Sequence, residues 1–111
     1  MPGFEQGDVV RIPFPYTDRN ARQHRPALVI SKGPLGSGDR LLWVAMITSA
    51  ENRPWPDDVP LGETYAAAGL PAPSVIRPSK IATIDIAVAQ RLGRVDDAVL
   101  SRTMRTIRGK L

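Results

Sequence analysis

Cysteine is absent from this sequence of 111 residues, and histidine occurs only once, at His24. Without thiols the chain cannot form disulfides, cysteine-ligated zinc or iron–sulfur sites, or a thiol nucleophile. The remaining potential ligands are carboxylates, and the adjacent pairs Asp57–Asp58 and Asp96–Asp97 lack the arrangement of a metal site. We therefore expect no metal or other cofactor, and an intracellular, cytoplasmic protein rather than a disulfide-stapled secreted one.

Long hydrophobic runs are missing as well. The longest continuous apolar run, Leu41 to Ile47, is far shorter than the roughly 20 residues that a helix needs to cross a bilayer. The N-terminal stretch MPGFEQGD has no basic segment followed by an apolar one, so it does not resemble a signal peptide. These absences predict a chain without membrane contact.

The chain does contain enough apolar residues for one core, together with an excess of positive charge. Hydrophobic residues make up 42% of the sequence, which suffices for a modest core in a single domain over residues 1–111. The net charge of +4 favours polyanionic partners such as nucleic acid. A merely well-solvated surface explains this charge equally well.

Three segments in the first half of the chain have the pattern of β-strands. Residues 8–16 alternate like a half-buried strand, and Pro13 and Pro15, which cannot donate to a ladder, indicate that this strand lies at an edge or ends there. Residues 26–32 are almost uniformly apolar and β-branched, which is typical of a strand covered on both faces. Residues 40–49 follow across a glycine-rich turn, so these two segments predict an antiparallel hairpin.

The second half begins with a proline-rich stretch over residues 50–73, which predicts a long, partly mobile loop. Regular structure resumes in residues 74–77 and 80–89, which we expect to form two successive strands. A short strand is expected at residues 91–95.

The last 16 residues, 96–111, predict a helix whose N-terminus is capped by Asp96 or Asp97. One arc of that helix is apolar (Val99, Leu100, Thr103, Met104, Ile107 and Leu111), and the opposite arc is basic (Arg102, Arg105 and Arg108). The apolar arc should pack and the basic arc should face water. Short strands followed by one terminal helix predict a mainly β fold, a small barrel or curled sheet closed by the helix.

The proposed hairpin brings three side chains together that could bind a phosphodiester. Arg25 opens the strand 26–32, and Thr48 and Ser49 close the strand 40–49, so antiparallel pairing places the arginine beside the two hydroxyls. A guanidinium can make two parallel charge-assisted bonds to phosphate oxygens. The alternative is that Arg25 is an ordinary solvated charge and that the hydroxyls only satisfy turn backbone.

Other common catalytic patterns are not supported. The glycines of GPLGSGD, residues 33–39, are not followed by a lysine and a helix, so they indicate a turn rather than a phosphate-binding loop. A serine–histidine–aspartate triad would have to use His24, but no serine lies on a nucleophile elbow.

Five motifs together resemble the MazF/PemK (Kid) family of toxins from type II toxin–antitoxin systems. They are GDVVRIPFPYTD, HRPALVIS, ITSA, PSVIRPSKIATID and RLGRV, spread in the family's order from Gly7 to about Val95. The resemblance implies an SH3-like β-barrel of the CcdB/PemK type and a homodimer. It also implies a metal-independent endoribonuclease that cuts single-stranded RNA, and a cognate antitoxin that covers the RNA groove and forms a DNA-binding complex with the toxin.

The resemblance also implies roles for individual residues. Arg25 and Thr48 correspond to the arginine and threonine that the family associates with cleavage, and Arg77 corresponds to an arginine near the scissile phosphate in Kid-like members. We assign Arg25 to stabilising charge on the phosphate and Thr48 to orienting it, with Ser49 as a helper in binding. For Arg77 the competing interpretation is a solvated charge at a strand end.

One position departs from the family pattern. Two residues after the arginine at position 77, Kid-like members can carry an acidic general base, whereas this chain has Ser79. Either His24 or Lys80 then moves the proton, or positioning and electrostatics carry most of the rate. Strand alternation argues against His24, because neighbouring residues point to opposite faces.

The remaining candidates for substrate binding are Arg22, which with His24 would attract RNA along its loop, and Trp55. Trp55 and Tyr65 could stack on unpaired bases or cover the groove, or could simply pack their loop onto the barrel. Two other functions stay open: a catalytically weak RNA- or protein-binding module on the same barrel, and DNA gyrase poisoning as by the related CcdB fold.

Overall fold

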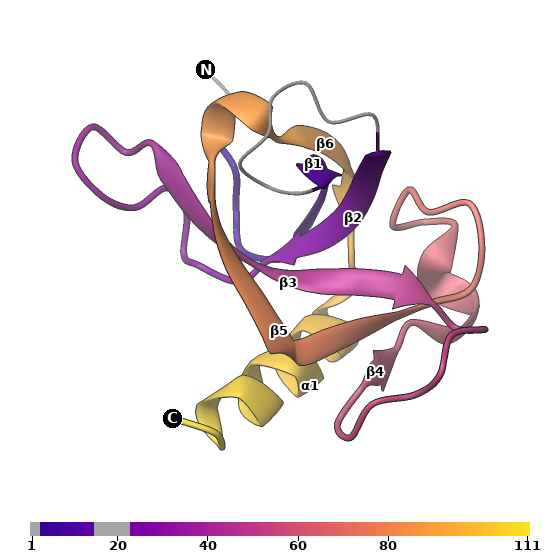
Figure 1. Cartoon of the computed structure of the whole chain (residues 1–111). Coiled ribbons are helices and arrows are strands. Elements are labelled where there is room, and N and C mark those ends of the chain that lie inside the picture. The colour runs from indigo at the N-terminus through magenta and orange to yellow at the C-terminus, as the bar shows by residue number, and fades with distance from the viewer. Residues whose placement is uncertain (1–2, 15–22) are drawn as a thin grey trace.

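The computed structural model describes residues 3–14 and 23–111 and is built on an antiparallel sheet of six strands, in the order β4-β5-β3-β2-β1-β6. The strands are β1 (Asp8–Phe14), β2 (Gln23–Val29), β3 (Leu41–Ser49), β4 (Val59–Pro60), β5 (Ser74–Asp85) and β6 (Gln90–Arg94). Two short 3-10 helices, η1 (Gly62–Tyr65) and η2 (Ile86–Val88), precede and follow β5, and helix α1 (Asp97–Arg108) ends the chain. Figure 1 shows the sheet curled on itself with α1 across its lower side. The predicted SH3-like, mainly β architecture with a C-terminal helix is confirmed.

The predicted hairpin of β2 and β3 is present. Its register pairs Ala27 with Met46 and Val29 with Val44, and the apolar end of β2 is buried on both faces as expected. The glycine-rich turn that joins the two strands folds back on the start of β3 through an isolated bridge between Leu35 and Leu41.

The first strand is more enclosed than its alternation predicted. Val9 and Val10 are both fully buried, because the curl of the sheet covers both faces of β1. β1 also lies inside the sheet, between β2 and β6. Pro13 is nevertheless tolerated, since the pairing with β6 ends at Arg11 and the strand itself ends at Phe14.

The expectation of two separate strands after residue 73 is wrong. β5 is one strand of 12 residues that bends sharply in its middle, as Figure 1 shows. Along β3, the partner changes from Ile81 at Ala45 to Arg77 at Met46, so residues 78–80 form an insertion opposite an uninterrupted β3. Pro78 cannot donate to a ladder, and a bulge at this point bends and twists the strand.

The segment 50–73, expected to be a long loop, is tied to the sheet. It contains β4, which pairs with β5, and η1, and the amide of Leu61 donates to the carbonyl of Ser74. Its end lies against β6: a Cβ at Gly69, where φ is +84°, would stand 2.3 Å from the carbonyl oxygen of Leu92. Glycine at this position therefore allows the segment to close the curl against the far edge strand.

Alternation along the central strands divides the core into two clusters. Val9 and Leu28 belong to one cluster, which α1 and the segment 59–70 cover. Val10 and Val44 belong to the other, against which Phe4 and residues around η2 pack. Within the described residues, no helix has the length and apolar character of a membrane span.

Helix α1 is close to its prediction. Asp96 is the N-cap, and its carboxylate accepts a hydrogen bond of 2.8 Å from the amide of Val99. Thr103 and Ile107 are buried, and the basic arc of Arg102, Arg105 and Arg108 is exposed as expected. Leu111, placed on the apolar arc, is instead 97% exposed, because the helix ends at Arg108.

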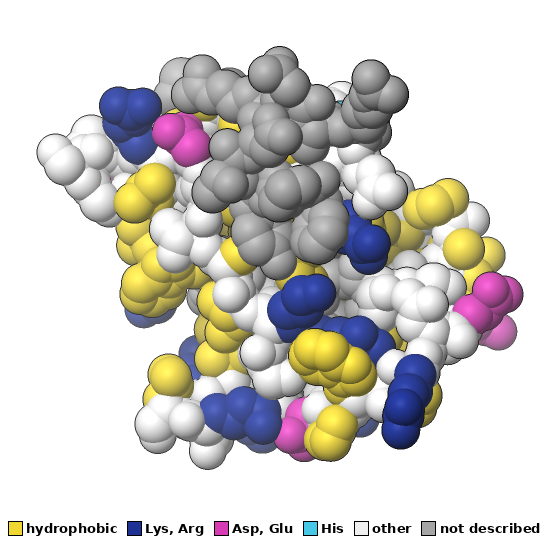
Figure 2. Space-filling view, viewed as in Figure 1, with side chains coloured by type: hydrophobic (Ala, Val, Ile, Leu, Met, Phe, Trp, Pro, Cys, Tyr) yellow, Lys and Arg dark blue, Asp and Glu magenta, His cyan; other side chains and the backbone are white. Residues whose placement is uncertain are grey.

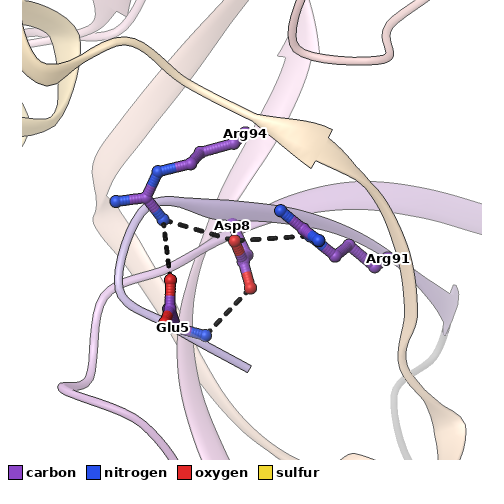
Figure 3. A network of polar contacts seen from close by, with 4 residues as sticks. All are labelled: Glu5, Asp8, Arg91 and Arg94. Carbon is purple, nitrogen blue, oxygen red and sulfur yellow. Dashed lines mark hydrogen bonds and ion pairs between the residues drawn. The ribbon is translucent and has the colours of Figure 1, made fainter. Parts of the chain in front are cut away.

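A buried carboxylate fixes β6 to the start of β1. Asp8 is 1% exposed; its Oδ2 accepts from the amide of Glu5 at 2.9 Å. Its Oδ1 lies 3.3 Å from Arg94 Nη1 and 3.5 Å from Arg91 Nε, as Figure 3 shows. We call these four residues, Glu5, Asp8, Arg91 and Arg94, the Asp8 cluster. Both arginines come from β6, so the cluster joins two distant parts of the chain.

Candidate functional site

An open cavity of about 270 Å³ lies where the end of β3, the middle of β5 and the loop after β3 meet. Its polar lining is cationic or neutral: Arg25, Thr48, Asn52, Arg53, Arg77 and Lys80. Trp55 stands at its rim, and Met46 and Ile47 contribute apolar floor. Figure 2 shows Lys and Arg side chains gathered on this face, over β3 and β5. Among the residues that the structure describes, no carboxylate lines this cationic cavity, which is therefore suited to an anion.

Arg25 and Thr48 line the cavity together because of the β2–β3 register. The last pair of the hairpin is Ala27 with Met46. Two residues beyond this pair, toward the open end of the hairpin, β2 carries Arg25 and β3 carries Thr48. Both side chains therefore point to the same face. The sequence argument for their proximity thus agrees with their positions in the structure.

The hydroxyls of Thr48 and Ser49 have different partners. Thr48 Oγ1 accepts a hydrogen bond of 2.5 Å from Asn52 Nδ2. Ser49 Oγ accepts from the amide of Glu51 at 3.2 Å, so this hydroxyl satisfies turn backbone, as the alternative interpretation held for both. Ser49 lines a neighbouring depression that also includes Arg25 and Thr48.

Arg77 is an enclosed cation, and the interpretation as a solvated charge at a strand end is wrong. Its side chain is only 11% exposed, because β5 bends at this position and the loop after β3 folds over it. Nη2 donates to the carbonyl of Arg53 at 2.6 Å, and Nε lies 3.4 Å from Asp58 Oδ1.

Trp55 covers this arginine. The Cζ atom of Arg77 lies 4.4 Å from the centre of the Trp55 ring, and Lys80 Nζ lies 6.0 Å from it. The tryptophan remains 41% exposed. Among the roles predicted for Trp55, covering the groove fits this position best. Its ring lies against the Arg77 guanidinium and is not buried in the barrel.

Two predicted substrate-binding residues lie away from the cationic cavity, and a third is not among the described residues. His24 lies in a separate hollow with Pro13, Ala87 and Val88, as strand alternation indicated. Ser79 is exposed on the bulge of β5 and does not line the cationic cavity, whereas its neighbour Lys80 does. Arg22 lies outside the described residues.

Three residues of the site were missed by sequence reasoning: Asn52, Arg53 and Asp58. All belong to the loop after β3, whose position depends on β5 rather than on local pattern. Asp58 was considered only as half of an acidic pair. Its Oδ2 accepts from the amide of Trp55 at 2.9 Å, three residues earlier, and this spacing is a turn signal that the sequence does contain. Among residues 3–14 and 23–111, no group of three or more histidine, aspartate or glutamate side chains is arranged to hold a metal ion.

Comparison with known proteins gives a consistent result. A model of the PemK-like, MazF-like toxins of type II toxin–antitoxin systems matches residues 5–111. No curated protein sequence matches the chain significantly.

Solved structures share the fold at low sequence identity. A MazE–MazF complex from Deinococcus radiodurans superposes with a TM-score of 0.74 at 19% identity, over 99% of this chain and 96% of that one. An endoribonuclease in complex with its cognate antitoxin, from a mycobacterial species, gives 0.69 at 18% identity, over 98% and 96%. The toxin MazF-mt6 of Mycobacterium tuberculosis gives 0.63 at 19% identity, over 93% of each chain. With a family match over nearly the whole sequence and this fold, the chain belongs to the PemK-like, MazF-like toxins of type II toxin–antitoxin systems.

Proposed function

We propose that this toxin is a metal-independent endoribonuclease that cuts single-stranded RNA, with the scissile phosphate bound in the cationic cavity. The observation that supports this most is the cavity's lining, where four cationic side chains and a threonine hydroxyl converge and no described residue contributes a carboxylate. Such a set of donors holds a phosphodiester and stabilises the charge that develops on it.

The reaction requires no nucleophile from the protein. The 2′-hydroxyl of the RNA attacks the adjacent phosphorus and loses its proton, while the bond to the 5′-oxygen breaks and that oxygen gains a proton. The products are a 2′,3′-cyclic phosphate and a 5′-hydroxyl. DNA lacks the attacking hydroxyl, which makes RNA the substrate.

The residues divide this work by their contacts. Arg25 and Arg77 stabilise the negative charge on the phosphate oxygens. Thr48 accepts its hydrogen bond from Asn52, which leaves the hydroxyl proton of Thr48 for a phosphate oxygen. None of the described lining residues is a carboxylate or an imidazole, so we assign most of the rate to positioning and electrostatics, with Lys80 as the lining group available for proton transfer.

The test is to incubate the purified protein with a long unstructured RNA in the presence of EDTA and to map the fragment ends. We expect cuts at a short sequence, with cyclic phosphate and 5′-hydroxyl ends. Arg25→Ala should lower the cleavage rate by roughly 1000-fold, the upper range for removing one charge-stabilising donor. Arg102→Ala, on the exposed arc of α1, is the matched control and should cut normally.

A second candidate, an RNA-binding module without turnover, is favoured because no carboxylate or imidazole that could serve as general base is found among the described lining residues. It predicts tight binding and intact RNA from a folded protein. Normal cleavage by Arg25→Ala would instead contradict the proposed site while leaving the activity in place.

We also propose a homodimer and a cognate antitoxin as partners, acting in the cytoplasm where the RNA is. An exposed apolar surface on β3 and β5 supports the dimer, because contact of apolar side chains with water is unfavourable. It includes Leu41, Trp43 and Ile81, and Leu111 lies beside Trp43 and Ile81. Sedimentation equilibrium should give twice the chain mass of 12.1 kDa. The antitoxin proposal is supported by the toxin–antitoxin complexes among the structures with this fold.

A further inference from the structure

We propose that Asp58 is a positioning residue, which together with Trp55 fixes the guanidinium of Arg77 toward the cationic cavity. This inference rests on the proposed function, because it concerns the site at which the scissile phosphate would bind. Asp58 does not line the cavity, so its effect on cleavage has to pass through the residues it holds there, Arg77 and the Trp55 ring that covers it.

The carboxylate of Asp58 links the loop to the strand. Its Oδ2 accepts from the amide of Trp55 at 2.9 Å, and the amide of Asp58 donates back to the carbonyl of Trp55 at 3.3 Å, which closes a tight turn over residues 55–58. Its Oδ1 faces Arg77 Nε at 3.4 Å. One side chain thus sets both the ring that covers the arginine and the charge beside it.

Burial makes the two charges depend on each other. The side chains of Asp58 and Arg77 are 10% and 11% exposed. Asp58 Oδ1 and Arg77 Nε are buried atoms, and neither has a hydrogen-bond partner among the described residues. Coulomb attraction between them is therefore weakly screened, and each would be left uncompensated without the other.

Three contacts on one guanidinium restrict what it can offer to a ligand. Asp58 faces Nε, the carbonyl of Arg53 takes a hydrogen bond from Nη2 at 2.6 Å, and the Trp55 ring lies 4.4 Å from Cζ. Within the described part of the chain, Nη1 and the second hydrogen of Nη2 are left for an anion. An arginine held in this way needs no reorganisation when charge develops on the phosphate, which is the condition for effective electrostatic stabilisation.

RNA affinity and the cleavage rate constant together distinguish a positioning role of Asp58 from a simple effect of its charge. Removing the negative charge of Asp58 makes the face around the cavity more positive, which should maintain or strengthen RNA binding. If Asp58 orients Arg77, the same change should lower the cleavage rate constant. A fall in rate at saturating RNA with unchanged or tighter binding therefore identifies positioning.

The experiment is Asp58→Asn in the full-length protein, with Asp57→Asn as the matched control. The asparagine oxygen can still accept from the amide of Trp55, but its amide group would face Arg77 Nε as a second donor. Asp57 is the neighbouring carboxylate, has φ +70° and pairs with Lys110 on the surface, and asparagine tolerates that backbone conformation.

The first readout does not depend on activity. In ¹H–¹⁵N spectra, Asp58→Asn should shift or broaden the Nε–H resonance of Arg77 and the indole N–H resonance of Trp55, and the control should move neither. The second readout is single-turnover cleavage at saturating RNA, with affinity measured on 2′-O-methyl RNA that cannot be cut. We expect a loss of rate of roughly 100-fold, typical of a misplaced catalytic group, and affinity equal to or higher than that of the wild type.

The outcomes separate this inference from the proposed function. Unchanged resonances, or a wild-type cleavage rate in Asp58→Asn, would overturn the positioning role. A wild-type protein that does not cut RNA would overturn the proposed function, while the spectra would still test whether Asp58 holds Arg77. If Asp58→Asn does not fold, Asp58→Glu carries the test: it keeps the charge but displaces the carboxylate. It should lose part of the rate, and a wild-type rate would again contradict the proposal.

Discussion

Among the described residues, two largely enclosed carboxylates, Asp8 and Asp58, pair with arginines, and the two pairs differ in which partner is protected from water. In the Asp8 cluster the carboxylate is buried, while the side chains of Arg91 and Arg94 are 57% and 38% exposed. At Asp58 both partners are enclosed, at 10% and 11%. The first arrangement neutralises a buried anion with cations that stay hydrated, and the second withdraws a cation from water.

The two carboxylates also differ in how completely their oxygens are hydrogen-bonded. Asp8 Oδ1 accepts a hydrogen bond from Arg94, and Oδ2 accepts from the amide of Glu5. Asp58 Oδ1 and Arg77 Nε face each other without hydrogen-bond geometry. The hydrogen bonds of the Asp8 cluster join elements of the fold, whereas the Asp58 pair lies beside an open cavity that Arg77 lines. We therefore expect the Asp8 cluster to contribute to stability and the Asp58 pair to contribute to the proposed site.

The largest expected effect comes from the arginines. Arg77→Ala should lower RNA cleavage by roughly 100-fold, because a preorganised donor to the phosphate is lost. Arg94→Ala is the matched change in the Asp8 cluster; it should leave the cleavage rate of the folded protein unchanged and lower the free energy of unfolding by about 1 kcal/mol, since Arg94 is partly exposed. Single-turnover cleavage and urea unfolding of both variants measure the two quantities. Equal losses of cleavage in the two variants would contradict the expectation that only the Asp58–Arg77 pair acts on the site.

A smaller effect is expected from the carboxylate of the Asp8 cluster. Asp8→Asn places an amide donor beside two guanidinium groups and should lower the free energy of unfolding by about 2 kcal/mol, within the range for disturbing a buried, hydrogen-bonded charge. Urea unfolding gives the value. Glu5→Gln is the control, because Glu5 is 77% exposed and its oxygen is 3.8 Å from Arg94. Asp8→Asn with wild-type stability, or with slower cleavage per folded molecule, would mean that this cluster also belongs to the site.

Local sequence pattern was sufficient for the parts of this molecule that depend on neighbouring strands. The hairpin of β2 and β3 follows from apolar runs across a glycine-rich turn, and its register is enough to bring Arg25 and Thr48 to one face. The capped helix follows from Asp96 and the 3.6-residue period. These features are set by interactions that alternate or repeat over short distances along the chain.

The rest of the site depends on contacts that the pattern does not contain. The bend of β5 comes from a change of register against β3, so the sequence of β5 alone indicated two strands. For Arg77, the resemblance pointed to the site, but a solvated charge stayed open as the alternative, because the loop that covers it lies about 20 residues earlier in the chain. Asp58 and Asn52 act through side chains of other elements, and loop residues of this kind carry no periodic signal.

The smallest effect is expected from a third ion pair, which joins α1 to the loop of the site. Lys110 Nζ lies 2.7 Å from Asp57 Oδ2, closer than any contact of Arg77 with Asp58, but the two side chains are 42% and 50% exposed. Lys110→Gln should therefore change the free energy of unfolding by less than about 0.5 kcal/mol and cleavage by less than about twofold, because solvent screens an exposed pair. Urea unfolding and single-turnover cleavage measure both, with Arg108→Gln on the same helix as the control. A loss of cleavage in Lys110→Gln alone would mean that the helix helps to hold the loop bearing Trp55 and Asp58. An exposed ion pair would then contribute to cleavage as the enclosed Arg77–Asp58 pair is proposed to do, and burial would not distinguish the ion pairs that act on the site.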